Sequence, residues 1–287
     1  MKVSLKTGKR LIGTSFILPW LIGFAVFTAF PLGYSIFLSF QKVSITPKGI
    51  VTDYVGLDNF SYAFTVDALF TQELLTYLEE LMISVPIILV FSLIIGLLLN
   101  QNIKFRGLFR TIFFLPVIIT SGPVIEELMA QGVTAIPSIE EYAVFNLILT
   151  NSESFFNSTI IYLMDNLIFI LWFSGVQILI FLAALQKIDR QVYEAAKIDG
   201  ASGWECFWKV TLPSLSPIII VNVIYTVVTY SIFALNPVVN HIQSNMFQIN
   251  TGFGYASALS WIYFGVIASV LLIVVGLLTL RANKKYS

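Results

Sequence analysis

Polar and aromatic residues in the stretch 217–236 are spaced as if they shared one face of a helix. They recur at intervals of three or four residues: Asn222, Tyr225, Thr229, Phe233 and Asn236. Amide and hydroxyl groups beside aromatic rings suit a sugar, whose hydroxyls form hydrogen bonds while its CH faces stack on the rings. We expect the stripe to face the interior of a helix bundle, because polar groups in lipid are costly. Ordinary polar contacts between helices would explain the same stripe. Trp172 and Gln177, in the preceding apolar block, are further candidates for the same path.

A second region, residues 187–213, mixes acidic and basic side chains. In its first half, Ile188, Val192, Ala195 and Ala196 fall on one helical face, and Glu194 lies on the opposite, charged face. The small alanine side chains would let another protein surface approach closely. An amphipathic hairpin at the membrane surface without a partner is the alternative that geometry alone leaves open.

The same region contains signals that end one helix and begin another. Gly200 permits the left-handed turn that ends a helix. Ser202 and Glu205 have the spacing of a capping box, which begins a helix. The aromatic residues Trp204, Phe207 and Trp208 follow at helical spacing, and Pro213 would stop this second helix. The pattern predicts a helix–turn–helix.

Catalytic and cofactor-binding patterns are not found in the sequence. No G-x-x-x-x-G-K-[ST] phosphate loop occurs, so the chain would not hydrolyse ATP in the P-loop manner. The chain has one histidine, His241, which we expect at the surface of an external loop, and one cysteine, Cys206. The basic residues are dispersed, which argues against nucleic-acid binding. We therefore predict no enzyme activity, no bound cofactor and no metal.

The elements that must position these residues are membrane helices. Of the 287 residues, 57% are hydrophobic and 11% are charged, whereas a soluble domain is about 25% charged. A bilayer needs about 20 apolar residues per helix. Six blocks have this length: Leu11–Phe40, Leu81–Leu99, Thr111–Ala130, Ile160–Leu185, Pro217–Asn236 and Leu259–Leu280. The sequence predicts an all-α membrane protein with six transmembrane helices.

Charge placement predicts the orientation of these helices. All of the 16 basic residues except Lys42 and Lys48 lie in the two terminal segments and in the segments after the second and fourth blocks. Basic residues favour the cytoplasmic side. We therefore expect both termini in the cytoplasm, with residues 1–10 and 282–287 as tails of a membrane domain at 11–281. The segment 187–213 would be cytoplasmic, and residues 131–159 an external loop.

Residues in and around the segment 187–213 resemble the EAA loop of permeases from binding-protein-dependent ABC importers. The matching residues are Glu194-Ala195-Ala196, Gly200 and Leu212-Pro213, with Val210 where the pattern usually has Ile. Phe181–Leu185, Asp199–Ala201, Tyr54–Phe60 and the stretch from Phe109 to Pro116 are similar to carbohydrate-type permeases, such as the inner-membrane subunits of maltose transporters. The resemblance covers most of the chain.

The resemblance implies a role for each of these residues. The loop would form a coupling helix between the fourth and fifth membrane helices and would insert into a cleft of an ATP-binding subunit. Glu194 would make the polar contact, Ala195 and Ala196 the close packing, and Gly200 and Pro213 the turn and the stop. The implied partners are a second related permease, two ATP-binding subunits that bind and hydrolyse ATP, and an external solute-binding protein.

The implied function is import of a sugar or oligosaccharide across a prokaryotic plasma membrane. A stand-alone ion-coupled transporter or channel is the main alternative, although no carboxylate cluster or inverted repeat is apparent in the membrane blocks. A membrane enzyme acting on lipid is a third possibility, which the absence of a catalytic cluster disfavours.

Overall fold

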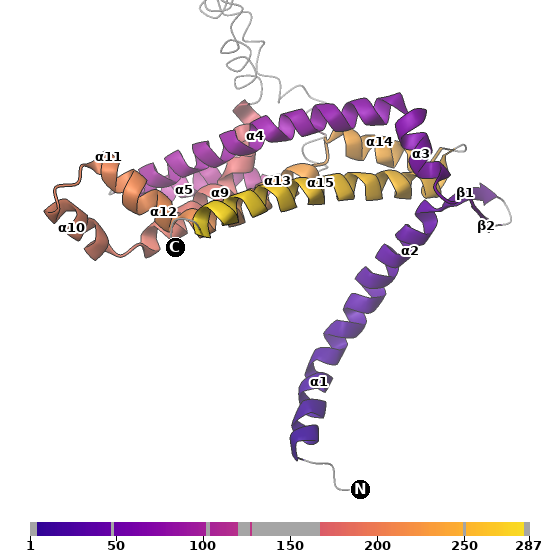
Figure 1. Cartoon of the computed structure of the whole chain (residues 1–287), viewed down its shortest axis with the longest axis horizontal. Coiled ribbons are helices and arrows are strands. Elements are labelled where there is room, and N and C mark those ends of the chain that lie inside the picture. Colours follow the sequence, from indigo (N-terminus) through magenta and orange to yellow (C-terminus); the bar gives the residue numbers. More distant parts are fainter. Residues whose placement is uncertain are drawn as a thin grey trace, which may run out of the picture. The chain divides into compact units, whose positions relative to one another are not determined.

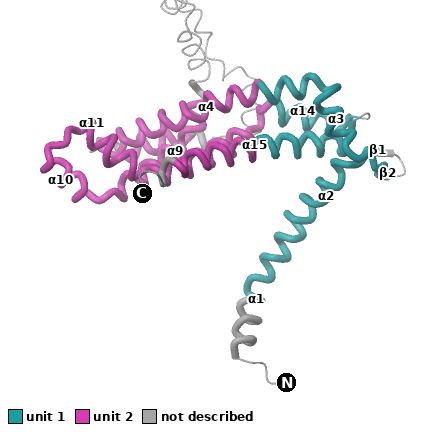
Figure 2. Tube along the Cα trace, viewed as in Figure 1, with its two compact units in different colours: residues 1–75, 237–266 teal, residues 76–236, 267–287 magenta. Residues whose placement is uncertain are grey.

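The computed structural model describes residues 5–46, 49–101, 104–119, 127, 167–248 and 251–283. These residues form helices and one β-hairpin (Figure 1). The chain divides into two compact units (Figure 2). The first unit is Met1–Leu75 with Pro237–Val266, and the second is Thr76–Asn236 with Ile267–Ser287.

The first unit contains both strands, six α-helices or parts of α-helices and a π-helical turn among the described residues. Its elements are α1 (Leu5–Phe24), a π-helical turn (Ala25–Ala29), α2 (Phe30–Ser39), β1 (Gln41–Thr46), β2 (Gly49–Tyr54), α3 (Asp58–Thr65), α14 (Pro237–Met246), and the first parts of α4 (Ala68–Asn100) and α15 (Gly252–Asn283).

The second unit contains the remainder of α4 and α15 and the helices between them. Its other elements are α5 (Arg106–Ile119), α9 (Leu167–Lys187), α10 (Arg190–Ile198), α11 (Gly203–Cys206), a π-helical turn (Phe207–Thr211), α12 (Leu212–Ser214) and α13 (Ser216–Ser231). Helix α9 packs against both α5 and α13.

Four described helical segments are long and apolar enough to cross a membrane: Thr14–Ser39, Ala68–Asn100, Phe169–Lys187 and Gly252–Leu280. The segments Gly203–Ser214 and Ser216–Ser231, bent by 64°, pass the same test only together, which gives up to five spans when the pair is counted as one. The predicted third block is described only as α5, and its remainder lies outside the described residues, as does the loop 131–159. The structure thus confirms a helical membrane protein and leaves the count of six a prediction.

The boundaries of several predicted elements were wrong. Helix α4 begins at Ala68 and α15 at Gly252, both well before the predicted apolar blocks, because the helical backbone hydrogen bonds continue beyond the most apolar stretch of each helix. Helix α1 begins at Leu5, within the predicted tail. Helix α13 ends at Ser231, before the predicted Asn236.

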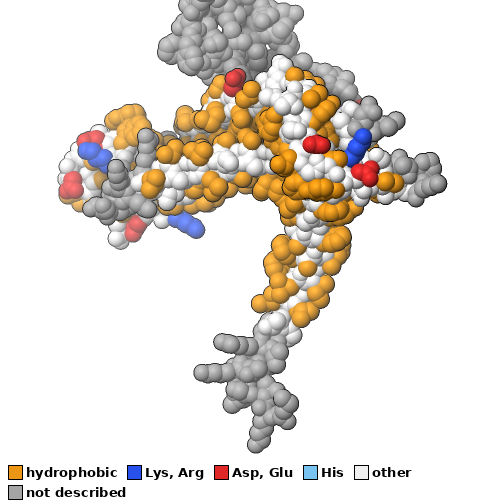
Figure 3. Space-filling model, turned by 45° about the vertical axis from the view of Figure 1, so that its right-hand side comes forward, with side chains coloured by type: hydrophobic (Ala, Val, Ile, Leu, Met, Phe, Trp, Pro, Cys, Tyr) orange, Lys and Arg blue, Asp and Glu red, His pale blue; other side chains and the backbone are white. Residues whose placement is uncertain are grey.

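The N-terminal span, Thr14–Ser39, is almost entirely exposed within the chain. Its mean hydropathy is 1.9, and 6% of its most apolar window is buried. Hydrophobic side chains cover its visible surface (Figure 3). Such a helix satisfies its own backbone hydrogen bonds, so its apolar side chains can face lipid.

The hairpin of β1 and β2 was not predicted. The strands pair antiparallel, with Gln41 opposite Tyr54 and Thr46 opposite Gly49. The start of α15 packs directly on β1: a Cβ atom at Gly254 would collide with the carbonyl oxygen of Gln41. The side-chain amide of Asn59 donates to that same oxygen, at 3.0 Å. β1 therefore has contacts with both α3 and α15.

Candidate functional site

Helix α10 has the local geometry that the sequence predicts. The carboxylate of Asp189 accepts a hydrogen bond from the backbone N–H of Gln191 at 3.0 Å and caps the helix start. At the other end, Gly200 has φ +82°. The backbone N–H of Ala201 donates to the carbonyl of Ala196 at 2.9 Å, as expected for a helix that ends in a left-handed glycine. The predicted turn at Gly200 is confirmed.

The side chains of α10 are accessible from outside the chain. No residue of this helix is buried. Glu194 and Ala195 are exposed and Ala196 is partly exposed. A Cβ atom at Gly200 would find no atom within 4 Å, so glycine is required there by the backbone conformation and not by lack of space. The helix thus exposes the small side chain of Ala195, and that of Ala196 in part.

The second helix of the predicted helix–turn–helix is also present. Ser202 and Glu205 form the predicted capping box: the Ser202 backbone N–H donates to Oε2 of Glu205 at 3.0 Å, and the Glu205 N–H donates to Oγ of Ser202 at 3.3 Å. Lys209 pairs with Glu205 at 3.2 Å. Pro213 lies in the short helix α12, which ends one residue later at Ser214. Figure 1 shows α10 and α11 as a helical hairpin beyond α9.

One hydrogen bond joins the two halves of this hairpin. The hydroxyl groups of Tyr193, on α10, and Thr211, before α12, lie 2.8 Å apart. Thr211 is buried. Because α13 begins directly after α12, a displacement of α10 would reach a membrane helix through this contact and the intervening chain. We call residues 187–213 the coupling segment.

The residues of the predicted polar stripe differ in their solvent exposure. Asn222 and Asn236 are buried, at 0% and 4% exposure, whereas Tyr225 is 37% exposed. The expectation that the whole stripe faces the bundle interior is therefore wrong for Tyr225. Thr229 is partly exposed, and its hydroxyl donates to the carbonyl of Tyr225 at 2.7 Å. Phe233 is partly buried.

Aromatic rings gather around Phe233. Its ring centroid lies 6.4 Å from Trp172, 5.0 Å from Phe173 and 6.0 Å from Phe169, each in an edge-to-face arrangement. Trp172 is 8% exposed. Asn236 is near the same end of α13, where its amide donates to the carbonyl of Ser231 at 3.2 Å. Two of the predicted path residues, Trp172 and Phe233, are thus brought into contact.

A polar contact in the middle of the bundle links α9 with α13. The amide of Gln177 donates to the hydroxyl of Thr226 at 3.0 Å, and both residues have 0% exposure. Within the described part of the chain, Oε1 of Gln177 and both side-chain amide atoms of Asn222 have no hydrogen-bond partner. Thr226 was not among the predicted residues, although it lies one turn from Asn222. Buried polar groups are normally hydrogen-bonded. Unpaired amide atoms inside the bundle therefore indicate a polar site that apolar packing alone does not explain.

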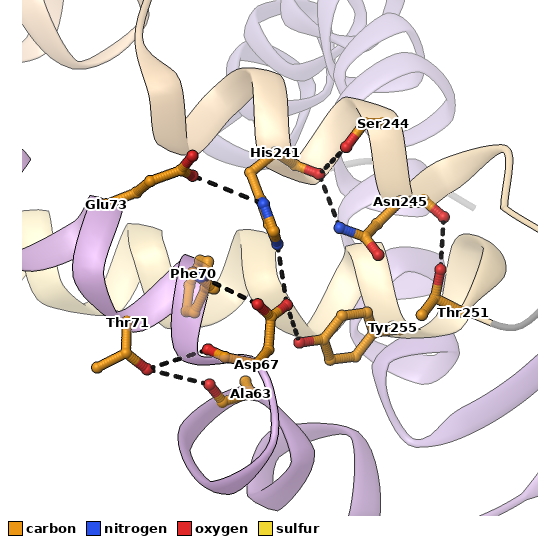
Figure 4. A network of polar contacts seen from close by, with 10 residues as sticks. All are labelled: Ala63, Asp67, Phe70, Thr71, Glu73, His241, Ser244, Asn245, Thr251 and Tyr255. Atoms are coloured by element: carbon orange, nitrogen blue, oxygen red, sulfur yellow. Dashed lines mark hydrogen bonds and ion pairs between the residues drawn. The ribbon is translucent and has the colours of Figure 1, made fainter.

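The first unit contains a carboxylate–histidine cluster, formed by Asp67, Glu73, His241 and Tyr255 (Figure 4). Nε2 of His241 donates to Oδ2 of Asp67 at 2.9 Å, and the Tyr255 hydroxyl donates to the same oxygen at 2.7 Å. Nδ1 of His241 lies 3.6 Å from Oε2 of Glu73. The His241 side chain is 10% exposed, so the prediction of a surface histidine was wrong.

Asp67 is the centre of this cluster. Burial opposes its ionisation, but hydrogen bonds from the backbone N–H of Phe70, from Tyr255 and from His241 together hold the pKa of Asp67 below its ordinary value. The cluster fastens α14 and α15 to the start of α4. Among the described residues, no group of three or more His, Cys, Asp or Glu side chains could hold a metal ion.

Comparison with known proteins places these features in a family. The family model described as "Binding-protein-dependent transport system inner membrane component" matches residues 69–285, which include the whole coupling segment. The chain is 32% identical to the probable ABC transporter permease protein YesP of Bacillus subtilis, over 97% of this chain and 91% of that protein. It is 29% identical to the lactose transport system permease protein LacF of Rhizobium radiobacter, over 81% and 75% of the two chains.

A solved structure supports the same fold. The chain is similar to a chain in the crystal structure of a bacterial alginate ABC transporter in complex with an alginate pentasaccharide-bound periplasmic protein. The TM-score is 0.64, and the match covers 93% of this chain and 94% of the other at 19% identity.

Proposed function

This chain belongs to the family of binding-protein-dependent transport system inner membrane components, and on that premise we propose how it works in a carbohydrate importer. It is a multi-pass membrane protein and a permease subunit of an ABC transporter. The observation that carries the mechanism is the exposed coupling segment, with its capped helices and its left-handed turn at Gly200.

In the proposed mechanism, α10 lies in a cleft of an ATP-binding subunit on the cytoplasmic side of the membrane. Glu194 makes the polar contact, and Ala195 and Ala196 pack closely against that subunit. Closure of the ATP-binding subunits displaces α10, and Gly200 and the Tyr193–Thr211 contact transmit the displacement towards α13. Pro213 lies at the end of the coupling segment, next to the bend that leads into α13.

Helix α13 is bonded to its neighbours, so it would not move alone. Besides the Gln177–Thr226 bond to α9, the hydroxyl of Tyr77 on α4 donates to the hydroxyl of Ser231 at 2.7 Å. These contacts would make α4, α9 and α13 respond together when the coupling segment is pushed. Alternating exposure of a central path to the two sides of the membrane would result.

The proposed substrate is a sugar or oligosaccharide. This proposal is supported by the relatives, which include permeases of lactose and arabinooligosaccharide transport systems. We propose that the path is lined by the residues selected from the sequence: Trp172, Gln177, Asn222, Tyr225, Thr229, Phe233 and Asn236. Because Gln177 and Asn222 are enclosed here, the substrate would reach them only when the helices separate.

The proposed assembly contains a second related permease, two ATP-binding subunits that bind and hydrolyse ATP, and an external solute-binding protein. The membrane is a prokaryotic plasma membrane. We propose six spans with residues 1–10 and 282–287 on the cytoplasmic side, because the basic residues of the chain concentrate there. The chain itself catalyses no bond chemistry in this scheme.

The test replaces Gly200 with valine in the complete importer, reconstituted in vesicles with its cognate binding protein. Valine strongly disfavours positive φ, so the turn must change and ATP-linked uptake should fall at least tenfold while the subunit remains in the membrane. Gly203→Ala is the matched control, because a Cβ atom there also meets nothing within 4 Å and no positive φ is required. Unchanged uptake in the valine variant, or uptake by the chain alone, would contradict the proposal.

A further inference from the structure

The helix that follows the turn at Gly200 has one buried face and one aromatic face. Cys206 and Thr211 are buried, whereas Trp204 is 70% exposed and Trp208 is 48% exposed. The two indole rings are in edge-to-face contact, with centroids 5.5 Å apart. Phe207 completes the group at 5.1 Å from Trp208. We call these three side chains the aromatic elbow. Contiguous exposed aromatic surface of this kind marks a site of contact with a partner or a membrane.

The position of the elbow along the chain favours the membrane. Helix α13 has 16 residues, which span about 24 Å at 1.5 Å per residue, whereas the apolar core of a bilayer is about 30 Å thick. Apolar residues on both sides of α13, such as Leu212 before it and Leu235 after it, must therefore complete the crossing. The last ring of the elbow, Trp208, lies one helical turn before Leu212, so it falls close to the end of the hydrocarbon region.

The composition of the elbow fits that depth. Gly203–Ser214 and α13 together are apolar enough for a membrane span, although they are bent by 64°. Tryptophan prefers the interface between lipid headgroups and acyl chains, where its ring is in an apolar region and its N–H can meet polar groups. Lys209, next to Trp208, has a side chain that is 74% exposed and forms an ion pair with Glu205 at 3.2 Å, so the rings border charged groups that must stay in a polar environment.

The elbow is also distinct from the surface assigned to the ATP-binding subunit. That surface is α10, with its small side chains, and it is separated from the elbow by the left-handed turn at Gly200. The contact surface proposed on α10 is formed by Glu194 and the small side chains of Ala195 and Ala196, whereas the elbow exposes two bulky indole rings. The two faces of the helical hairpin thus have different chemistry.

We propose that Trp204 and Trp208 anchor the coupling segment in the headgroup region of the bilayer leaflet that faces it. The elbow is held by lipid while α10 moves with the ATP-binding subunit. The movement of α10 then changes the backbone at residues 200–202 and results in a tilt of α13. This inference goes beyond the proposed function, because it assigns a lipid contact to residues for which the proposed mechanism gives no role.

The experiment measures the depth of the indole rings by fluorescence quenching. The complete importer is reconstituted in lipid nanodiscs, and the emission of the variant with Trp204→Phe and Trp208→Phe is subtracted from that of the unaltered importer. Three quenchers are compared: a lipid with a nitroxide on its headgroup, a lipid brominated in the middle of its acyl chains, and iodide in the buffer. Trp20, which lies within the N-terminal span and is 66% exposed, provides the depth control through Trp20→Phe.

The headgroup nitroxide should quench the elbow at least twofold more than the brominated chains, and iodide should have little effect. The brominated chains should quench Trp20 more than the headgroup nitroxide does. Strong quenching by iodide would overturn the proposal. The proposal would also be overturned if no quencher reached the rings until the ATP-binding subunits were removed, because the elbow would then lie against those subunits.

A second readout follows transport. Alanine at both tryptophans should lower the amount of sugar taken up per ATP hydrolysed several-fold, and phenylalanine at both should restore most of it, because phenylalanine retains an apolar ring. An equal loss in both variants would contradict lipid anchoring. Quenching reports position without transport, so its failure would leave the proposed function standing.

Discussion

The coupling segment and the carboxylate–histidine cluster are stabilised in opposite ways. The coupling segment consists of short, largely exposed helices whose caps are made by residues within a few positions of one another, such as Ser202 and Glu205. The cluster joins residues from distant parts of the sequence, as the pair Asp67 and Tyr255 shows. In this permease, the coupling segment is therefore specified by residues close together in the sequence, whereas the first unit depends on tertiary contacts.

The comparison predicts that changes in the first unit alter stability, whereas changes in the coupling segment alter the link between ATP hydrolysis and uptake. Uncoupling by a change in the first unit, or a large loss of stability from a change in the coupling segment, would contradict this distinction.

The largest effect is expected at Gly254. In Gly254→Ala, the new methyl group collides with the carbonyl oxygen of Gln41, so β1 or α15 must shift. We expect a loss of about 3 kcal/mol in the free energy of unfolding, measured as a lower thermal midpoint in detergent. Gly265→Ala is the control on the same helix, where a Cβ atom meets nothing within 4 Å. Equal midpoints in the two variants would contradict the close packing of α15 on β1.

Asp67→Asn should have the next largest effect. It removes the charge that accepts hydrogen bonds from His241, Tyr255 and the backbone of Phe70. Hydrogen bonds to a charged group contribute about 1.5–3 kcal/mol, so we expect a loss near the middle of this range. The readout is the thermal midpoint, with Asp53→Asn, an exposed residue of β2, as control. Uptake per ATP should be unchanged in the protein that remains folded, and a marked uncoupling would break the comparison.

Ser202→Ala should have a smaller effect that is confined to the coupling segment. Loss of a capping side chain costs about 1 kcal/mol, so the start of α11 should fray. Hydrogen exchange at Gly203–Cys206 should accelerate, and uptake per ATP should fall. Ser214→Ala is the control, because that hydroxyl donates to the carbonyl of Val210, one turn earlier in the chain, and caps no helix start. Unaltered exchange at Gly203–Cys206 would show that the cap does not support this helix.

The smallest effect is a pH dependence of the cluster. Because the pKa of Asp67 is lower in the folded chain than its ordinary value of 3.8, ionised Asp67 stabilises the fold above that value, and this stabilisation is lost as the pH falls through the folded pKa. The thermal midpoint of the unaltered chain should therefore fall at acidic pH more than that of Asp67→Asn. Parallel curves for the two proteins would argue that Asp67 has no special environment.

The local chemistry of the coupling segment could be read from its residues. The turn at Gly200, the capping box and the helix of small residues depend on neighbours in the sequence, and each is present in the structure. The long apolar spans were predictable for a similar reason, because length and hydrophobicity are properties of a continuous segment.

The remaining features depended on contacts between distant residues. The β1–β2 hairpin had a signal in the β-branched residues on either side of Gly49, but a short hairpin gains its stability from packing, here on α3 and α15. His241 was placed at the surface because nothing near it in the sequence suggests the carboxylates that surround it. Only Asn222, Tyr225 and Thr229 of the predicted stripe lie on α13, because the helix ends at Ser231, before Phe233 and Asn236. Helix packing decided that Asn222 is buried and Tyr225 is partly exposed.

The sequence by itself thus determined that the chain is a helical membrane protein, and it determined the helices of the coupling segment and the turn at Gly200. Hydropathy, capping and backbone preference act over a few neighbouring residues. Only the tertiary structure decided where α14 and α15 are held, which amides are enclosed and which rings of the elbow are exposed. Those outcomes depend on which surfaces meet when helices far apart in the chain pack together, and no local pattern specifies that.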